Sequence, residues 1–373
     1  MSYLSRRQKR QSVQAASPQD FMRFLLDYHH LTADTTVRGR PGLTKVLEQL
    51  QGLDLPAGAW EQQVIQKRLP DYDPLWLDEF CYRGELAWLR LTPPNTPAKA
   101  NTMAPRKATP ITLVFREDLP WLLAAARTQG PEPPQTGPVQ EIADILQTQG
   151  ASFLPDLADA THRLPDDIER ALWNGVALGL FTADGFAAVR ALLNRTNRRP
   201  TRHRPGQNLR SQTLRTRSNR INRALTMRSP AQTHAAPGRW SLVQQPEQYP
   251  AEDLAEAVAQ QLLACWGVVF RSLAHHPATP TATPWRDILK ALRRFEDRGL
   301  VRGGRFVAGQ SGEQFALPAA ADQLQATARR PRTNQAITIA ACDPLNLTGI
   351  LFDGPRTPAT ANNTLTYTDG LPA

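Results

Sequence analysis

The sequence predicts a mainly helical protein with small β-hairpins and sheets, built as a tandem array of three winged-helix units and completed by a β-rich C-terminal segment. Two observations carry this prediction: a helix–glycine–strand joint recurs three times, and shorter helices precede each joint. The length agrees with it, because a chain of 373 residues exceeds what one hydrophobic core usually organises.

The joint is the strongest repeated signal in the chain. Each copy has a leucine seven residues before a glycine and an apolar residue seven residues after it, in LDEFCYRGELAWLRL from Leu77, LWNGVALGLFTADGF from Leu172 and LRRFEDRGLVRGGRF from Leu292. A glycine directly after a helix readily adopts the left-handed conformation that ends the helix. We therefore expect the helix to turn into a β-ribbon at each of these glycines. Three unrelated joints are the alternative, but the shared register favours a repeat.

The other elements follow from the spacing of apolar residues, which recur at helical intervals or alternate as in strands. Ser17 and Pro18 are placed as the N-cap and first residue of a helix that reaches Tyr28. Further helices are expected over 42–52, 57–69, 73–84, 139–150, 152–161, 165–179, 251–267 and 285–298. Strands are expected over 85–91, 111–115 and 180–186, in a hairpin around Gly303-Gly304, and between 336 and 370.

Six segments are expected along the chain. They are a disordered tail over 1–17, a first unit over 18–130, a second unit over 131–193, an arginine-rich tether over 194–238, a third unit over 239–318 and a β-rich segment over 319–373. The tether follows from composition, because arginines interleaved with polar residues cannot bury a core.

The net charge of +10 and the isoelectric point near 10.0 favour an anionic partner, and nucleic acid is the commonest one. The segment from Arg195 to Arg228 holds eleven arginines and no lysine, aspartate or glutamate. Since eleven exceeds the net charge of +10, the rest of the chain carries one net negative charge. The tether is therefore expected to bind phosphates without sequence preference.

Several kinds of chemistry lack their motifs. The sequence contains no P-loop for a nucleoside triphosphate, no His-Glu-x-x-His metal motif and no Gly-x-Ser-x-Gly nucleophile. Cys81, Cys265 and Cys342 lie far apart, which predicts neither a zinc site nor a disulfide framework. No metal or cofactor is expected. Without a signal peptide pattern or an apolar run of membrane-spanning length, the expected location is the cytoplasm, away from membranes.

The helix expected over 285–298 has a cationic side opposite an apolar face. As the third helix of its unit it is the element expected to enter a DNA groove, with the following hairpin as the wing. The residues predicted to contact DNA are Arg286, Lys290, Arg293, Arg294, Arg298, Arg302 and Arg305. A solvated basic face is the alternative, because Glu296 and Asp297 dilute the charge.

Gln51 and Asp54 lie in a polar stretch, LEQLQGLDLPAGAW, that could serve base excision. A carboxylate or amide beside an extruded nucleotide can position water and offset the positive charge that develops on the sugar. The alternative is that Asp54 has no role in base excision and is an ordinary loop or cap residue before Pro56.

Taken together, the chain resembles the C-terminal region of the bacterial large helicase-related proteins. The resemblance is carried by GLTKVLEQLQGLDLPAGAWEQQVIQKRLPDYDPLWLDEFCYRGELAW, PITLVFREDLPWLL, GRWSLV, WGVVFRSLA, PWRDILKALRRFEDRGLVRGGRFVAGQSGEQFALP and DPLNLTGIL. It covers most of 18–373 in the same order, and this region is also similar to the winged-helix DNA glycosylases of the AlkZ type. The resemblance implies a DNA-binding module associated with repair.

It also implies catalytic residues. In those glycosylases a Gln-x-Gln or Gln-x-Asp motif follows a leucine. Leu50-Gln51 fits that entry, while Asp54 falls one position late and Gln49-Leu50-Gln51 fits in a shifted register. The family's C-terminal aspartate, in a region to which activity on uracil has been attributed, is matched by Asp369, for which an ordinary turn residue is the alternative. The helicase motor of the large proteins has no counterpart in this sequence.

Two functions from different classes are therefore expected. One is a DNA glycosylase acting on uracil or alkylated bases, with Gln51 and either Asp54 or Asp369 at the sugar–base bond. The other is a non-catalytic module that binds DNA and supports oligomerisation or the docking of a separately encoded helicase motor. A winged-helix transcriptional regulator ranks last, because nothing in the sequence suggests an effector pocket.

Overall fold

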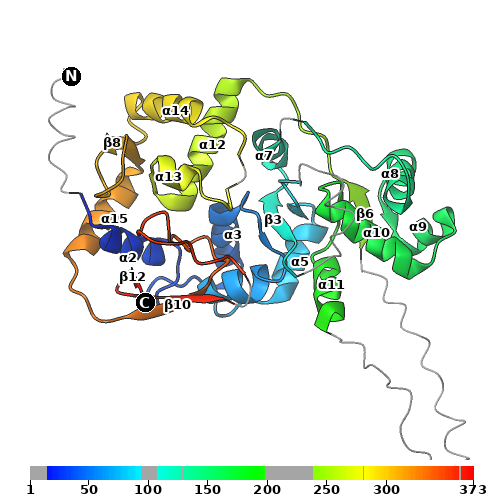
Figure 1. The fold of residues 1–373 in the computed structure, drawn as a ribbon, viewed down its shortest axis with the longest axis horizontal. Coiled ribbons are helices and arrows are strands. Elements are labelled where there is room, and N and C mark those ends of the chain that lie inside the picture. Colours follow the sequence, from blue (N-terminus) through cyan, green and yellow to red (C-terminus); the bar gives the residue numbers. More distant parts are fainter. Residues whose placement is uncertain (1–14, 94–106, 128, 198–237, 280, 361–362) are drawn as a thin grey trace, which may run out of the picture.

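The protein was analysed as a computed structural model, which describes residues 15–93, 107–127, 129–197, 238–279, 281–360 and 363–373. Its described part is an elongated molecule in which three helical units and a C-terminal sheet follow the long axis (Figure 1). Residues 1–14 of the tail predicted over 1–17 and most of the predicted tether, over 198–237, lie outside the described residues. The last residues of the predicted tail are ordered, because Ala16 pairs with Val307 and Ser17 caps the first helix.

The first unit contains two helices, a short strand, a helical stretch that begins as a π-helix, a further helix, two longer strands and a closing helix. Its elements are α2 (Pro18–Tyr28), α3 (Gly39–Leu50), β1 (Leu55–Pro56), the π-helix η1 (Trp60–Ile65), α4 (Gln66–Arg68), α5 (Pro74–Tyr82), β2 (Leu86–Leu89), β3 (Pro110–Phe115) and α7 (Leu119–Ala126). The predicted N-cap at Ser17 is confirmed, since its hydroxyl accepts a hydrogen bond from the Asp20 N–H at 3.1 Å.

The second and third units repeat this order. The second consists of α8 (Pro138–Gln149), β4 (Ser152–Phe153), α9 (Leu154–Thr161), α10 (Pro165–Ala177), β5 (Phe181–Ala183), α11 (Ala187–Asn197) and β6 (Arg239–Leu242). The third consists of α12 (Ala251–Trp266), β7 (Val268–Val269), α13 (Arg271–Ala274), α14 (Trp285–Asp297), β8 (Arg302–Gly304), β9 (Gln314–Ala316) and α15 (Pro318–Arg329). The C-terminal sheet consists of β10 (Ala336–Ala340), β11 (Thr364–Thr368) and β12 (Leu371–Pro372).

All three units have the same sheet topology. The strand orders are β1-β3-β2, β4-β6-β5 and β7-β9-β8, so the last strand of each unit always lies between the other two, and every pairing is antiparallel. A short strand after the first helix, a third helix and a β-ribbon are the parts of a winged helix. The predicted fold, a mainly helical array of winged-helix units with small antiparallel sheets, is confirmed. The segment over 319–373 was predicted to be β-rich, but it begins with the helix α15 and only then forms the sheet of β10, β11 and β12.

The recurring joint is confirmed in atomic detail. Gly84, Gly179 and Gly299 have φ of +75°, +73° and +78°. The N–H after each glycine donates to the carbonyl five residues back, at 3.0, 2.8 and 2.9 Å, and the glycine N–H donates to the carbonyl three residues back. These are the two hydrogen bonds of a Schellman motif. The leucines and apolar residues of the register are all buried, at Leu77, Leu172, Leu292, Leu91, Phe186 and Phe306.

The boundary predicted between the tether and the third unit differs from the structure. Strand β6 begins at Arg239, directly after the predicted tether, and pairs with β4 and β5 of the second unit. The predicted tether therefore lies in the sequence between α11 and β6, two elements of the second unit, and does not link the second unit to the third. The first residues of the predicted tether, 194–197, belong to α11. The prediction failed because local composition carries no information about which distant strands pair.

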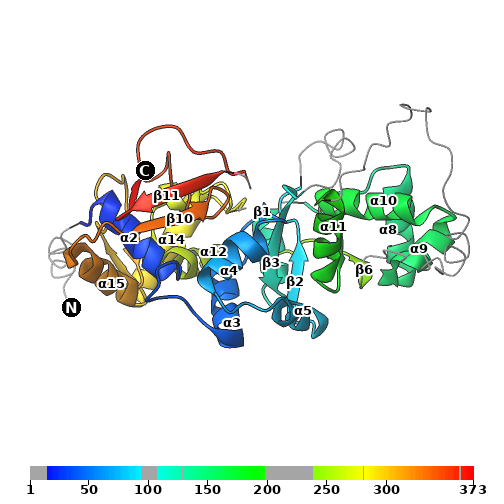
Figure 2. The same ribbon diagram turned by 90° about the horizontal axis from the view of Figure 1, so that it is seen from below.

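The first unit lies between the third and the second, although it comes first in the chain (Figure 1 and Figure 2). Helix α2 packs on α15, and α12 packs on both α3 and α7. On the other side, three fully buried tryptophans join the first and second units. Trp88 stacks on Trp173 with ring centroids 5.7 Å apart, and Trp240 of β6 meets both rings edge-on.

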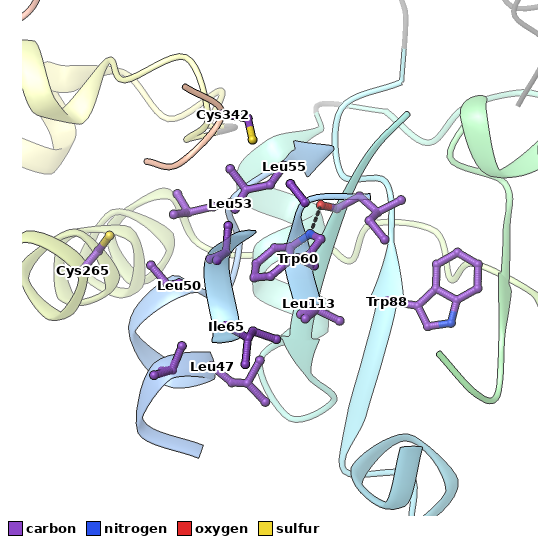
Figure 3. Packing of buried hydrophobic residues seen from close by; sticks show 14 of the residues in the cluster. Leu47, Leu50, Leu53, Leu55, Trp60, Ile65, Trp88, Leu113, Cys265 and Cys342 are labelled. Atoms are coloured by element: carbon purple, nitrogen blue, oxygen red, sulfur yellow. Dashed lines mark hydrogen bonds between the residues drawn. The ribbon is translucent and has the colours of Figure 1, made fainter. Parts of the chain in front are cut away.

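The main hydrophobic cluster extends through all three units and the C-terminal segment, and a smaller second cluster lies mainly in the first unit, with Leu89, Leu91 and Leu123 among its members. Trp60 is buried among leucines of α3 and the strands, and its Nε1 donates to the Ile111 carbonyl at 2.9 Å (Figure 3). A buried ion pair fixes the C-terminal segment to this core, because Arg68 donates to both Asp343 oxygens, at 2.7 and 3.0 Å, with both side chains fully buried. Loss of either partner would leave an uncompensated buried charge.

Two of the joint glycines provide a matched test. A Cβ at Gly299 would meet no atom within 4 Å, so Gly299→Ala should cost only the left-handed backbone, about 1–2 kcal/mol. A Cβ at Gly179 would lie 2.6 Å from Nη2 of Arg127 and 3.2 Å from the Arg90 carbonyl oxygen. Gly179→Ala should therefore lower the urea midpoint of unfolding clearly more than Gly299→Ala. Equal shifts of the two midpoints would contradict the packing described for Gly179.

Candidate nucleic-acid interface

Helix α14 carries the largest set of basic residues among the three third helices. It has four, against one in α10 and none in α5, within the bounds of these helices. Ile288, Ala291, Leu292 and Phe295 form its buried face. The opposite side is solvent-exposed, so the amphipathic pattern predicted for this helix is confirmed.

Three exposed cations of α14 are held by neighbouring acids. Arg286 and Lys290 flank Asp287, at 3.5 and 3.0 Å, and Arg293 donates from Nε to Glu313 at 3.1 Å. The basic side chains are 80%, 65% and 53% exposed. Ion pairs this exposed contribute little to stability, so a phosphate group can replace the acid at little cost.

The other predicted cations lie toward neighbouring elements. Arg294 and Arg298 both pair with Glu256 of α12, at 2.9 and 3.4 Å, which fixes α14 against the first helix of its own unit. Arg302 pairs with Asp322 of α15 at 2.6 Å. Arg305 is exposed and makes no ion pair with the residues that the structure describes.

The wing of the third unit differs from the predicted hairpin. Gly303 and Gly304 lie within β8, where they pair with Phe315 and Gln314, and so do not form the tip. A Cβ at Gly303 would lie 2.7 Å from a Glu296 carboxylate oxygen, so a side chain there would displace the end of the Glu296 side chain on α14. The chain turns instead through 309–312, where Gly309 and Gly312 have positive φ.

The base of this wing depends on a residue that the sequence reasoning missed. The Gln314 side chain accepts hydrogen bonds from the N–H groups of Phe306 and Val307, at 2.7 and 2.8 Å, and donates to the Val307 carbonyl at 2.9 Å. Gln314 is almost fully buried. It holds the chain beyond β8 in place, and so fixes Arg305 beside α14. The sequence carries no signal for this role, because the burial of Gln314 follows from the pairing of β9 with β7 and β8.

Gln51 has its hydrogen-bonding capacity satisfied within the protein. Its Nε2 donates to Asp118 at 2.9 Å and to the Gln261 side-chain oxygen at 3.3 Å, and its Oε1 accepts from the Phe115 N–H at 3.3 Å. The adjoining cavity, lined largely by apolar groups that include Trp121, is only about 30 Å³ in volume. This is the space of one water molecule, so it admits no nucleotide.

Asp54 is enclosed at the start of the first unit's wing. Its carboxylate accepts hydrogen bonds from the N–H groups of Leu91 and Thr92, at 3.3 and 3.1 Å, and from the Thr92 hydroxyl. Burial raises its pKa, and these donors, together with the charge of Arg90, only partly oppose the rise. The arrangement is that of a side chain that holds the wing.

Two buried arginines next to Asp54 connect the units, and sequence reasoning missed both. Arg90 donates to the Ala177 carbonyl at the end of α10, at 2.8 Å. Arg127 donates to the Leu91 carbonyl at 2.7 Å and also to the Arg90 carbonyl. Arg90 thus caps α10, while Arg127 holds the carbonyls of Arg90 and Leu91. Atoms of both arginines lie beside Gly179, which explains why that glycine has no room for a side chain.

Asp369 is the candidate acid that lies nearest to solvent. Its oxygens accept from the N–H groups of Thr333 and Asn334, at 3.2 and 2.7 Å, and its φ is +47°. Desolvation by itself would raise its pKa, but the backbone N–H donors outweigh it, so the pKa lies below the usual value and the group is ionised at neutral pH. It borders a polar cavity of about 50 Å³ that also includes Arg23 and Arg330.

The structure does not bring the three candidate acids and amides together. Gln51 and Asp54 belong to the loop between α3 and β1, whereas Asp369 follows β11 in the C-terminal sheet, and the cavities beside Gln51 and Asp369 share no lining residue. Among the described residues, no three His, Cys, Asp or Glu side chains group as metal ligands. No helix in that part of the chain is long and apolar enough to cross a membrane.

The repeated topology and the cationic third helix define a tandem winged-helix protein of the kind that associates with DNA. Residues 16–115 and 248–336 each match a winged-helix domain family of the large helicase-related protein, the third and fourth such domains respectively. The chain carries these two domains and resembles the C-terminal region of the large helicase-related proteins.

Two relatives extend the similarity over most of the chain. It is 30% identical to a Mycolicibacterium smegmatis protein described as an Lhr helicase and probable uracil glycosylase, over 93% of this chain and 22% of that protein. It is 29% identical to the Escherichia coli Lhr helicase/uracil glycosylase, over 88% of this chain and 21% of that protein. The chain thus spans about a fifth of the length of these relatives.

Proposed function

We propose that this protein is a DNA-binding module associated with DNA repair, in which α14 and the wing of the third unit contact duplex DNA. The observation that carries the proposal is the exposed row Arg286, Lys290 and Arg293, whose acids are surface groups that phosphates can displace. Release of counterions from the DNA would favour the exchange. Arg305, fixed through Gln314, would contact the backbone beside the helix.

We further propose that the module cleaves the sugar–base bond of damaged nucleotides. The two relatives are named as uracil glycosylases, one of them as a probable one. Of the candidate groups, Asp369 fits this role best, because its ionised carboxylate lies nearest to solvent, where a nucleotide of bound DNA could reach it from outside, and because the adjoining cavity has room for about one or two water molecules. An ionised carboxylate can orient such a water and offset the charge on the sugar. Asp54 and Gln51 are enclosed and would contribute only by stabilising the fold.

The alternative is a non-catalytic module that binds DNA, assembles with further copies or docks on a separately encoded helicase motor. Two observations favour it: the three units pack tightly, and the side chains of Gln51 and Asp54 form their hydrogen bonds within the protein. It requires the same DNA contacts by α14, so the two readings differ only in bond cleavage.

Removal of the exposed cations should weaken duplex binding. In the triple variant Arg286→Ala, Lys290→Ala and Arg293→Ala, each lost phosphate contact should reduce the slope of log affinity against log salt by about 0.9. Fluorescence anisotropy with a labelled duplex across several salt concentrations measures both quantities.

The matched control for this test is Arg83→Ala, Arg163→Ala and Arg170→Ala, which removes three positive charges from the other two units. These side chains are 63%, 36% and 65% exposed, so the fold should tolerate their loss. We expect the control to keep most of the parent affinity and slope. An equal loss in both triple variants would mean that charge alone, and not α14, determines binding.

Incubation with duplexes that carry uracil or an alkylated base, followed by alkali, tests the cleavage proposal. The parent chain should break the strand at the lesion, and Asp369→Asn should slow this by about a hundredfold or more, because an amide cannot offset the sugar charge. Asparagine tolerates the left-handed backbone at this position, so folding should be preserved. Asp353→Asn, an exposed residue of the same segment, serves as the control. Strand breakage on no lesion would leave the non-catalytic module as the function.

A further inference from the structure

A cavity of about 360 Å³ lies between the first unit and α11 of the second unit, away from α14 and from all the candidate acids. The cavities beside Gln51 and Asp369 are about 30 and 50 Å³. Small-molecule sites in proteins start near 300 Å³, so this cavity alone of the three has the size of a ligand site.

The floor of the cavity is a preorganised polar network. Arg190 of α11 donates to Glu61 from Nε and Nη2, at 2.9 Å each, and from Nη1 to Asp78 at 2.6 Å. Tyr72 donates its hydroxyl proton to Glu61 at 2.7 Å. Because Glu61 and Arg190 are only 15% and 22% exposed, the network keeps its geometry and joins the two units at this point.

The mouth of the cavity carries carboxamides without a function in the fold. Gln62, Gln66 and Asn194 are exposed and line the cavity. Their side-chain carboxamides make no hydrogen bond with the other described residues. Gln62 and Gln66 are four residues apart on either side of the end of η1, so they lie on the same side of the helix. Single π-helical turns are frequently found at functional sites.

Close backbone approach shapes the remaining wall. A Cβ at Gly58 would lie 3.2 Å from Cβ of Lys107 and 3.4 Å from Cδ2 of Leu193. The absence of a side chain at this position lets the base of the first unit's wing and α11 meet around the cavity. Leu193 and Pro74 then provide apolar surfaces, and Lys107 contributes a cation to the lining.

This combination suits a nucleobase within a DNA strand. Carboxamides donate and accept hydrogen bonds in the patterns that base edges present, whereas a charged ligand would need more charges than Lys107. A free nucleoside triphosphate is disfavoured for the same reason. The sequence that follows α11 holds ten of the eleven arginines counted from Arg195 to Arg228, which favours a polyanion as partner. We infer that the cavity binds one unpaired nucleotide of single-stranded DNA, through Gln62, Gln66 and Asn194.

This inference rests on the proposed function for the identity of the partner but uses a different surface, so the two can be tested apart. The probe is single-stranded DNA with 2-aminopurine at one internal position, whose fluorescence changes when the base is unstacked. The full chain should bind it and change its emission. In Gln62→Ala with Gln66→Ala, the affinity should fall on the order of tenfold, as expected for two lost hydrogen bonds.

Gln147→Ala with Gln149→Ala is the matched control, because these exposed amides of α8 lie outside the cavity. It should bind as the parent does. A second variant, Asn194→Trp, should fill the mouth and abolish the emission change without disturbing the core, since Asn194 is exposed. Duplex affinity should be the same in all of these variants.

Parent-like binding of the single strand by both cavity variants would overturn the inference and leave the duplex contact of α14 intact. Binding of an RNA strand of the same sequence, but not of DNA, would overturn the assignment to DNA. A chain that binds neither duplex nor single-stranded DNA would refute the proposed function, and the inference with it.

Discussion

The glycine that ends the third helix of each unit is the constraint on which the rest of the structure depends. Only a left-handed residue at Gly84, Gly179 and Gly299 lets the helix close with two hydrogen bonds and send the chain directly into a strand. The strand then places the wing beside the helix. Each unit therefore presents its third helix and its wing on one side, whatever side chains they carry.

Because the three units share this scaffold, they differ mainly in the residues that pack against it. In the second unit, the joint at Gly179 is covered by Arg90 and Arg127 from the first unit, so that joint serves assembly. In the third unit, the joint at Gly299 has no atom within 4 Å of a Cβ position, and α14 keeps an exposed cationic side. The same helix–glycine–strand joint thus packs against a neighbouring unit in one case and, as we propose, supports DNA binding in the other.

Much of this architecture could be predicted from the sequence, because the joint is a local feature. The seven-residue register of Leu292, Gly299 and Phe306 reports helix, turn and strand within one short stretch. Strand pairing is not local. The pairing of β6 with β4 and β5, and the two-residue strands β1, β4 and β7, depend on partners far away in the chain. The candidate site was predicted only in part, for the same reason. The basic helix α14 could be predicted from its amphipathic pattern. The burial of Asp54 and the cavity at Arg190 could not, because they arise only where units meet.

Amide hydrogen exchange with and without duplex DNA tests the central claim most directly, namely that one unit of the repeat contacts DNA while the equivalent surface of another does not. We expect DNA to slow exchange in α14 and in the wing over 305–313, and to leave α10 unchanged. Slowed exchange in α10 with none in α14 would contradict the account, because the acidic third helix would then be the one that contacts the phosphates.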